Sequence, residues 1–168
     1  TSAFYEIRKQ GNVFFAYIEL STFGTDTAKQ VEKALEMFKK KNIQTLVIDL
    51  RDNGGGYLTA ATDILDLFFT SDEVIYQMKE KNSAAKKYYA ESDKKYEFEN
   101  GYILVNENTA SASELTAGAL QSEKGYQLIG KTTYGKGSAQ TQKTLSDGSV
   151  LKYTYAKWMI PNGTCING

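Results

Sequence analysis

Histidine is absent from this chain of 168 residues, and cysteine occurs once. Without histidine there is no Ser-His-Asp triad, no Cys-His dyad and no metal site built on imidazole. The single cysteine, Cys165, cannot form an internal disulfide or a cysteine-rich zinc site. We therefore expect no metal and no cofactor, and any proton transfer must use a side chain other than histidine.

Long apolar runs and an excess of one charge are also missing. The formal net charge is zero, which gives no sign of a nucleic-acid or anionic-membrane partner. No apolar run approaches the ~20 residues of a membrane span, and no signal peptide is visible. The length predicts one domain over residues 1–168. Because the first residue is Thr1 instead of Met, we expect a piece of a longer protein.

The apolar periodicity predicts alternating strands and helices. Helices are expected around residues 28–38, 58–69 and 111–124, with Thr25 or Asp26 capping the first. Strands are expected at 4–8, 13–20, 44–50, 73–79, 102–105 and 126–129, followed by a hairpin with arms 138–145 and 150–159. The run 44–50 (QTLVIDL) is typical of a strand buried on both faces. The polar segment 82–99 stays unassigned, with a short strand and a mobile flap as the alternatives. This alternation favours a layered α/β fold.

The segment 106–114 (NENTASASE) places a serine between an expected strand and an expected helix. The first N–H groups of a helix have no partner within it, so a hydroxyl there lies beside donors that can stabilise an oxyanion. The same letters fit a capping box in which Ser111 and Glu114 cap the helix. Both roles stay open for Ser111, and Ser113 is a second candidate for the cap.

The segment 130–138 (GKTTYGKGS) surrounds Lys136 with glycines. It nearly spells a P-loop, but Gly137 stands where magnesium binding needs Ser or Thr, and a strand is expected next instead of a helix. Glycines let the backbone pack closely, so Lys136 can enter a desolvated site where a lysine accepts a proton more readily. A solvated turn lysine is the alternative.

Three glycines follow the apolar strand in the loop 51–56 (RDNGGG). Glycine allows positive φ angles and close approach to the backbone, and ligands gather at the carboxyl ends of strands in open α/β sheets. Free N–H groups in this loop can therefore serve an oxyanion. A plain flexible turn is an equal alternative.

Taken together, the three segments resemble those of the C-terminal processing peptidases, also called tail-specific proteases. That family has a Leu-Arg-Asn/Asp-Asn-Pro-Gly-Gly loop, a Thr-Ala-Ser-Ala-Ser-Glu segment and a Thr-Phe-Gly-Lys-Gly-x-x-Gln segment. They match Leu50 to Gly56, Thr109 to Glu114 and Thr133 to Gln140, in the same order. Lys136 also lies 25 residues after Ser111, as the family pattern expects.

The resemblance implies a fold like the crotonase and ClpP folds, with stacked β-β-α units and a mixed sheet flanked by helices. It implies that Ser111 is the nucleophile, that Lys136 is the general base and that Gln140 orients the ammonium. The oxyanion hole would use the backbone N–H groups of Ala112 and of Gly55 or Gly56. The implied activity is a serine endopeptidase that cleaves extended peptide near protein C termini.

Further expectations follow from the same resemblance. Relatives carry a PDZ domain and a C-terminal extension that residues 1–168 do not include, and Gly54 replaces the usual loop proline. The implied location is bacterial and extracytoplasmic, in the cell envelope or secreted. Two alternatives are a catalytically silent relative that binds a peptide or other ligand, and a crotonase-like acyl-CoA enzyme. The second would leave the pair of Ser111 and Lys136 unexplained.

Overall fold

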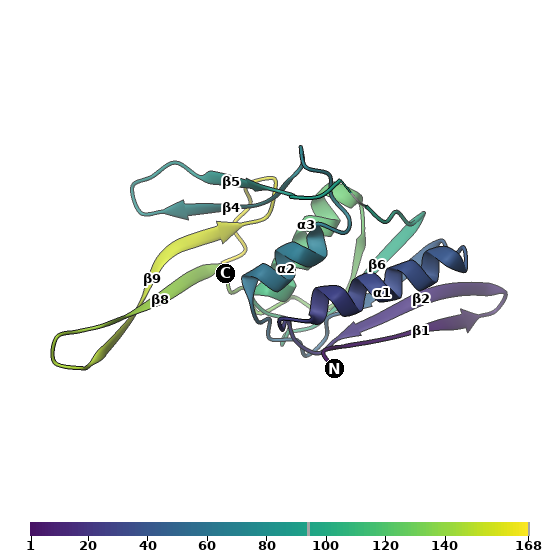
Figure 1. Cartoon of the computed structure of the whole chain (residues 1–168), viewed down its shortest axis with the longest axis horizontal. Coiled ribbons are helices and arrows are strands. Elements are labelled where there is room, and N and C mark those ends of the chain that lie inside the picture. Colours follow the sequence, from purple (N-terminus) through teal and green to yellow (C-terminus); the bar gives the residue numbers. More distant parts are fainter. Residues whose placement is uncertain (94, 168) are drawn as a thin grey trace.

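The computed structural model describes residues 1–93 and 95–167, which form an α/β arrangement of two sheets and three helices (Figure 1). The sequence-based elements are confirmed, with boundaries shifted by a few residues. In chain order the elements are β1 (Ala3–Gln10), β2 (Val13–Leu20), α1 (Thr27–Lys40), β3 (Thr45–Asp49), α2 (Leu58–Leu65), β4 (Val74–Glu80), β5 (Lys86–Tyr89), β6 (Asn100–Val105), α3 (Ala112–Lys124), β7 (Gln127–Gly130), β8 (Ser138–Thr144) and β9 (Val150–Met159).

Five strands form a mixed sheet in the order β1-β2-β3-β6-β7. The pair β1 and β2 is antiparallel, whereas β2 with β3, β3 with β6 and β6 with β7 are parallel. Parallel neighbours bring their carboxyl ends to the same edge of a sheet. The loops that follow β3, β6 and β7 therefore meet at one edge.

Helix α1 covers β1 and β2 through an apolar stripe. Val31, Leu35 and Phe38 recur at helical spacing and are buried in the core. The expected side-chain cap is wrong, because Asp26 precedes the helix but its side chain makes no capping hydrogen bond. Instead, Thr27 Oγ1 accepts the N–H of Gly24 at 2.9 Å, which fixes the entry into the helix.

The helices cover only one face of the five-stranded sheet. Leu46 and Ile48 of β3 are buried beneath the helices, while Val47 between them is only half-buried. The expectation that this strand is buried on both faces is therefore wrong. The opposite face holds a shallow cavity of about 510 Å³ lined by side chains that include Phe15, Val47 and Leu104.

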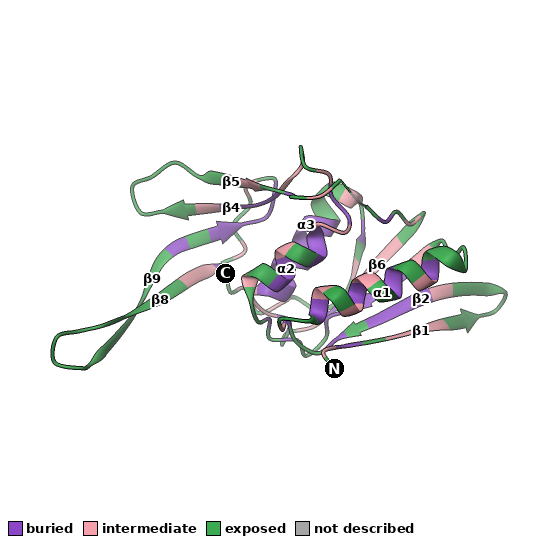
Figure 2. Ribbon diagram, viewed as in Figure 1, coloured by how far each residue is buried: buried purple, intermediate pink, exposed green. Residues whose placement is uncertain are grey.

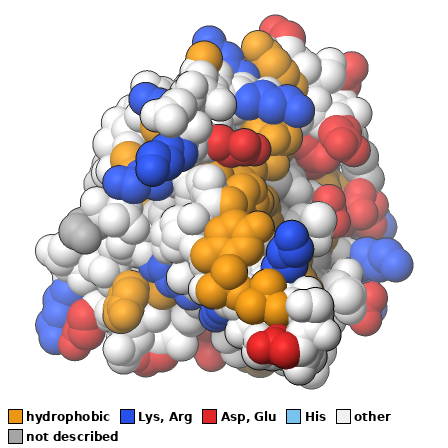
Figure 3. All heavy atoms as spheres, turned by 90° about the vertical axis from the view of Figure 1, so that its left-hand side faces the viewer, with side chains coloured by type: hydrophobic (Ala, Val, Ile, Leu, Met, Phe, Trp, Pro, Cys, Tyr) orange, Lys and Arg blue, Asp and Glu red, His pale blue; other side chains and the backbone are white. Residues whose placement is uncertain are grey.

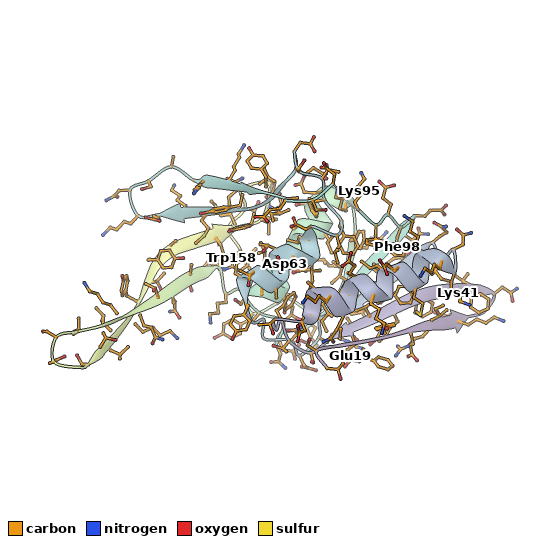
Figure 4. All side chains as sticks on the ribbon, in the orientation of Figure 1. Glu19, Lys41, Asp63, Lys95, Phe98 and Trp158 are labelled. Atoms are coloured by element: carbon orange, nitrogen blue, oxygen red, sulfur yellow. The ribbon has the colours of Figure 1, made fainter. Side chains whose placement is uncertain are left out.

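The second sheet has the order β5-β4-β9-β8, and helices α2 and α3 lie between it and the first sheet (Figure 1). Trp158 of β9 is buried where this sheet meets the helices (Figure 4). The distal part of the β8–β9 hairpin projects from the body and is exposed (Figure 2). Figure 3 shows hydrophobic side chains gathered on this end of the molecule, where the hairpin exposes Leu151, Tyr153 and Tyr155.

Candidate active site

Three loops meet at the carboxyl ends of β3, β6 and β7. Thr109 links all three: its hydroxyl donates to the carbonyl of Leu50 at 2.8 Å, and its carbonyl accepts the N–H of Tyr134 at 3.0 Å. The N–H of Ala110 donates to the carbonyl of Asn53 at 3.1 Å. The three sequence segments that carry the resemblance are thus adjacent in space, as the parallel strand order requires.

Ser111 occupies a strained turn immediately before helix α3. Its φ of 58° and ψ of −118° lie in a region that residues with a side chain rarely adopt. Such conformations cost on the order of 1–3 kcal/mol and cluster at functional sites. Ser111 and Glu114 also form the expected capping box, and the role of the Ser111 hydroxyl in chemistry stays a prediction.

The glycine loop packs directly on this turn. Gly55 has a φ of +97°, and a Cβ built there would lie 3.0 Å from the amide nitrogen of Ala112. Gly56 has a φ of +147°, and a Cβ there would overlap the backbone of Phe23. Both glycines are therefore required by geometry, which excludes the alternative of a plain flexible turn.

The two loop glycines differ in the use of their N–H groups. The N–H of Gly55 donates to Asn53 Oδ1 at 2.9 Å. Phe23 forms a parallel bridge with Gly56 through the carbonyl of Gly55 and the N–H of Tyr57. The bridge leaves the N–H of Gly56 directed away from Phe23, and no acceptor for it occurs in the described part of the chain.

Asn53 is a residue that the sequence reasoning missed. Its side chain is fully buried and donates to the carbonyl of Leu20 at 2.7 Å, while its carbonyl accepts the hydroxyl of Ser113 at 2.9 Å. The glycine loop is thereby joined to β2 and to α3. Ser113 uses its hydroxyl in this bond, so the suggestion that Ser113 caps the helix is wrong.

Lys136 lies in the loop between β7 and β8, as expected, but its side chain is exposed. A strand and not a helix follows it, which rules out a P-loop. Gly135 has a φ of +84°, and a Cβ on Gly137 would lie 2.8 Å from the backbone nitrogen of Asn167. The glycines therefore serve close backbone packing, while the expected desolvation of the lysine side chain is not provided by residues 1–93 and 95–167.

Gln140 is the first residue of β8 beyond a register shift and is also exposed. Its Nε2 donates weakly to Thr154 Oγ1 at 3.4 Å. Among the described residues no hydrogen bond joins Lys136 Nζ to Gln140 or to Ser111. The structure brings the backbones of the three segments together, and the roles of these side chains stay predictions.

The backbone of Lys136 is nevertheless tied to the serine turn through Glu114. This carboxylate is buried and accepts the N–H groups of Ser111 at 2.7 Å, Gly135 at 2.6 Å and Lys136 at 2.9 Å. The sequence pattern had assigned Glu114 only to the cap. The local sequence does not predict the bonds from Gly135 and Lys136, because these two donors lie in a loop more than 20 residues away.

A second polar cluster stiffens the loop after β3. Arg51 binds Asp49 through Nε and Nη2 at 3.0 and 2.6 Å, and Tyr17 donates its hydroxyl to Asp49 at 2.7 Å. Burial raises the pKa of Asp49, but the hydrogen bonds from Arg51 and Tyr17 outweigh it and leave the pKa below its ordinary value. The carboxylate is therefore held in its charged form at the base of the glycine loop.

The described residues were searched for clustered metal ligands and for long apolar helices. No group of three or more His, Cys, Asp or Glu side chains is placed to hold a metal ion within residues 1–93 and 95–167. None of the described helices is long and apolar enough to cross a membrane. Cys165 is exposed near the end of the chain and lies outside the cluster described above.

An α/β fold of this topology with a strained serine at the start of a helix fits the class of serine-type peptidases. Within that class the chain belongs to peptidase family S41, whose family model matches residues 15–168. The family resemblance inferred from the three segments is therefore confirmed.

Curated relatives and solved structures agree with this assignment. The chain is 40% identical over 151 residues to the carboxy-terminal processing protease CtpB of Bacillus subtilis, covering 90% of this chain and 31% of the relative. It is 36% identical over 163 residues to CtpA of the same organism, covering 97% of this chain and 34% of the relative. The chain thus spans about a third of the length of these relatives.

The fold matches that of the photosystem II D1 C-terminal processing protease, with a TM-score of 0.88 and 28% identity over 99% of this chain and 46% of that one. Mature CPAF shares the fold at a TM-score of 0.77 and 12% identity, with coverage of 98% of this chain and 47% of that one. The expected α/β fold with a mixed sheet flanked by helices is confirmed.

Proposed function

We propose that this chain is the catalytic core of a serine endopeptidase in which Ser111 is the nucleophile and Lys136 is the general base. The carrying observation is the positive φ of Ser111, 58°, immediately before the first turn of α3. Ordinary helix capping does not require this strain. A chain without histidine also leaves lysine as the available base for serine activation.

In the first step Lys136 Nζ, in its neutral form, takes the proton from Ser111 Oγ as the oxygen attacks the scissile carbonyl. The C–N bond of the tetrahedral intermediate then breaks, and Lys136 returns the proton to the leaving amine. A water activated by the same lysine attacks the acyl-enzyme and releases the new carboxyl terminus. Gln140 would orient the ammonium through its side-chain oxygen, because its Nε2 already faces Thr154.

The developing oxyanion would be stabilised by two backbone donors. Ala112 is the first residue of α3, so its N–H has no acceptor within the helix. For the second donor the structure favours Gly56, because the N–H of Gly55 already donates to Asn53 Oδ1. Removal of one such donor typically costs ~10²–10³ in rate.

Because Lys136 is exposed in the free chain, its ammonium group would lose its water only when a substrate binds. A peptide laid along the loop would cover Nζ and thereby favour its neutral form. Strand β8 begins two residues after Lys136 and lies at the edge of its sheet, so it offers a free edge for an extended peptide. We infer that substrate binding itself completes the desolvation.

The substrate class proposed is protein or peptide near a C terminus, by similarity to the carboxy-terminal processing proteases. Relatives three times longer leave room for a PDZ domain outside residues 1–168, which would deliver the substrate. An extracytoplasmic location is proposed on the same similarity. No nucleic acid is expected as a partner.

One observation favours a second function. Since Lys136 makes no hydrogen bond to Ser111 within the described residues, the chain would also fit a catalytically silent relative that only binds peptide. The two functions differ in whether Ser111 acts as a nucleophile. They can therefore be separated by one substitution.

The test is cleavage of an unstructured peptide with a free carboxyl terminus, with products identified by mass spectrometry. The wild-type chain should cleave it, and Ser111→Ala should abolish cleavage. Ser122→Ala, an exposed serine on the same helix, should cleave like the wild type. Cleavage that survives in Ser111→Ala would overturn the proposal, and binding without cleavage by the wild type would favour the silent relative.

A further inference from the structure

Glu114 is a buried carboxylate in the first turn of α3, with 3% of its surface exposed. Within the described residues it forms no ion pair with a lysine or arginine. A buried carboxylate is costly unless hydrogen bonds replace the lost water. Here three backbone N–H groups supply them.

The three donors come from the two segments that carry the proposed nucleophile and base. Glu114 Oε2 accepts from Ser111 N at 2.7 Å and from Lys136 N at 2.9 Å. Oε1 accepts from Gly135 N at 2.6 Å. One carboxylate therefore bridges the backbone of Ser111 and the backbone of Lys136.

Helix capping does not account for this arrangement. In a capping box the Glu114 side chain needs to accept only the N–H of Ser111, while the Ser111 side chain accepts the N–H of Glu114. The bonds to Gly135 and Lys136 span 21 and 22 residues and join the loop after β7 to the first turn of α3. Within the described residues the segments 106–114 and 130–138 are also joined by the bond from Tyr134 N to Thr109 O at 3.0 Å and by the exposed ion pair between Lys131 Nζ and Glu107 Oε1 at 3.1 Å.

We propose that Glu114 is a positioning residue that fixes the Lys136 loop against Ser111, so that the base and the nucleophile keep one relative position. The inference rests on the proposed function for its kinetic consequence, and on geometry alone for the structural link. Displacement of a catalytic group by about 1 Å can lower a rate by ~10².

The isosteric variant Glu114→Gln separates the three bonds. An amide has one acceptor oxygen, and its NH₂ group cannot accept. The oxygen should occupy the Oε2 position, where it keeps two bonds, and the NH₂ group should then face the N–H of Gly135. The link to Gly135 is lost while those to Ser111 and Lys136 remain.

The first measurement is amide hydrogen exchange in the full chain, which does not depend on activity. In Glu114→Gln the exchange rate of Gly135 should rise at least ~10-fold, while Ser111 and Lys136 stay protected. Glu123→Gln, at an exposed position on the same helix, should change none of the three. Unchanged exchange at Gly135 in Glu114→Gln would overturn the link.

The second measurement is the rate at which a serine-directed fluorophosphonate labels Ser111, in a double-mutant cycle with Lys136→Ala. If Glu114 acts through the lysine, Glu114→Gln slows labelling ~10-fold in the wild-type background and has no further effect in the Lys136→Ala background. Equal slowing in both backgrounds would show a merely structural role and overturn the positioning role.

The two proposals fail in different ways. No labelling of Ser111 in the wild-type chain contradicts the proposed function, while the exchange experiment still decides the link at Gly135. Normal labelling of the wild type with equal labelling of Glu114→Gln contradicts only the positioning role.

Discussion

Gly55 lies directly against Ser111. A Cβ built on Gly55 would come within 3.0 Å of Ser111 Cβ and 2.8 Å of the carbonyl oxygen of Ala110, and Gly55 has a φ of +97°. The backbone of the glycine loop therefore packs against the serine turn with no room for a side chain at position 55. Any side chain at position 55 must displace one of them.

Substitution of Gly55 should consequently affect both stability and activity. Gly55→Ala places an L-residue at positive φ, which costs roughly 1–2 kcal/mol, and pushes the Ser111 turn out of place. We expect the melting temperature to fall by roughly 2–4 °C per kcal/mol. Peptide cleavage per folded molecule should fall ~10²-fold.

The neighbouring glycine provides the matched control. Gly54 has no left-handed φ, and a Cβ there would meet no atom within 4 Å. Gly54→Ala should raise the free energy of unfolding by about 0.4–1 kcal/mol, because alanine lowers the conformational entropy of the unfolded chain. Cleavage should stay unchanged. Equal effects of the two substitutions in calorimetry and cleavage would contradict the contact between Gly55 and Ser111.

Ser113 should matter for stability more than any exposed serine of α3. Its buried hydroxyl donates to the carbonyl of Asn53 at 2.9 Å, so Ser113→Ala removes one hydrogen bond between the helix and the glycine loop. Because Ala110 N still donates to that carbonyl, the expected loss is about 0.5–1.5 kcal/mol in chemical denaturation. Ser122→Ala should stay within about 0.5 kcal/mol of the wild type.

Asp49 should make the chain more stable at neutral pH than in acid. Hydrogen bonds from Arg51 and Tyr17 lower its pKa in the fold despite the opposing effect of burial. A lowered pKa favours the charged form, so this stabilisation is complete above the unfolded pKa of ~3.9 and is lost as the pH falls below it.

The variant Asp49→Asn tests this pH dependence by urea unfolding at two pH values. The substitution should cost roughly 1–3 kcal/mol at pH ~7 and clearly less at pH ~2.5. Asp63→Asn, at an exposed position of α2 labelled in Figure 4, should cost little at either pH. A cost for Asp49→Asn that does not shrink in acid would refute the assignment.

The sequence predicted the parts of this fold that depend on local periodicity. Leu46 and Ile48 indicated a buried strand, and Val31, Leu35 and Phe38 indicated one face of a helix. It did not predict the open face of the five-stranded sheet, where Val47 lies, because apolar runs do not show which face a helix covers. In the segment 82–99, rich in lysine and tyrosine, the alternative of a short strand is confirmed by β5, whose bounds the pattern did not give.

For the candidate site, the three segments were found through their order and spacing, and their adjacency follows from the parallel strands β3, β6 and β7. The contacts within the site could not be predicted from local sequence patterns, because the partners are far apart in the sequence. Asn53 reads as a turn residue, yet it is buried and joins the glycine loop to two other elements. Glu114 reads as a helix cap, yet two of its three bonds reach a loop more than 20 residues away.

The proposal that Lys136 activates Ser111 as a nucleophile is tested most directly by reaction of the chain with a serine-directed fluorophosphonate, followed by mass mapping of the labelled peptide. We predict a single label on Ser111, and labelling of Lys136→Ala at least ~10²-fold slower, since a positioned base contributes ~10²–10⁴ to the rate. A label on another serine, or equally fast labelling of Ser111 without Lys136, would contradict it.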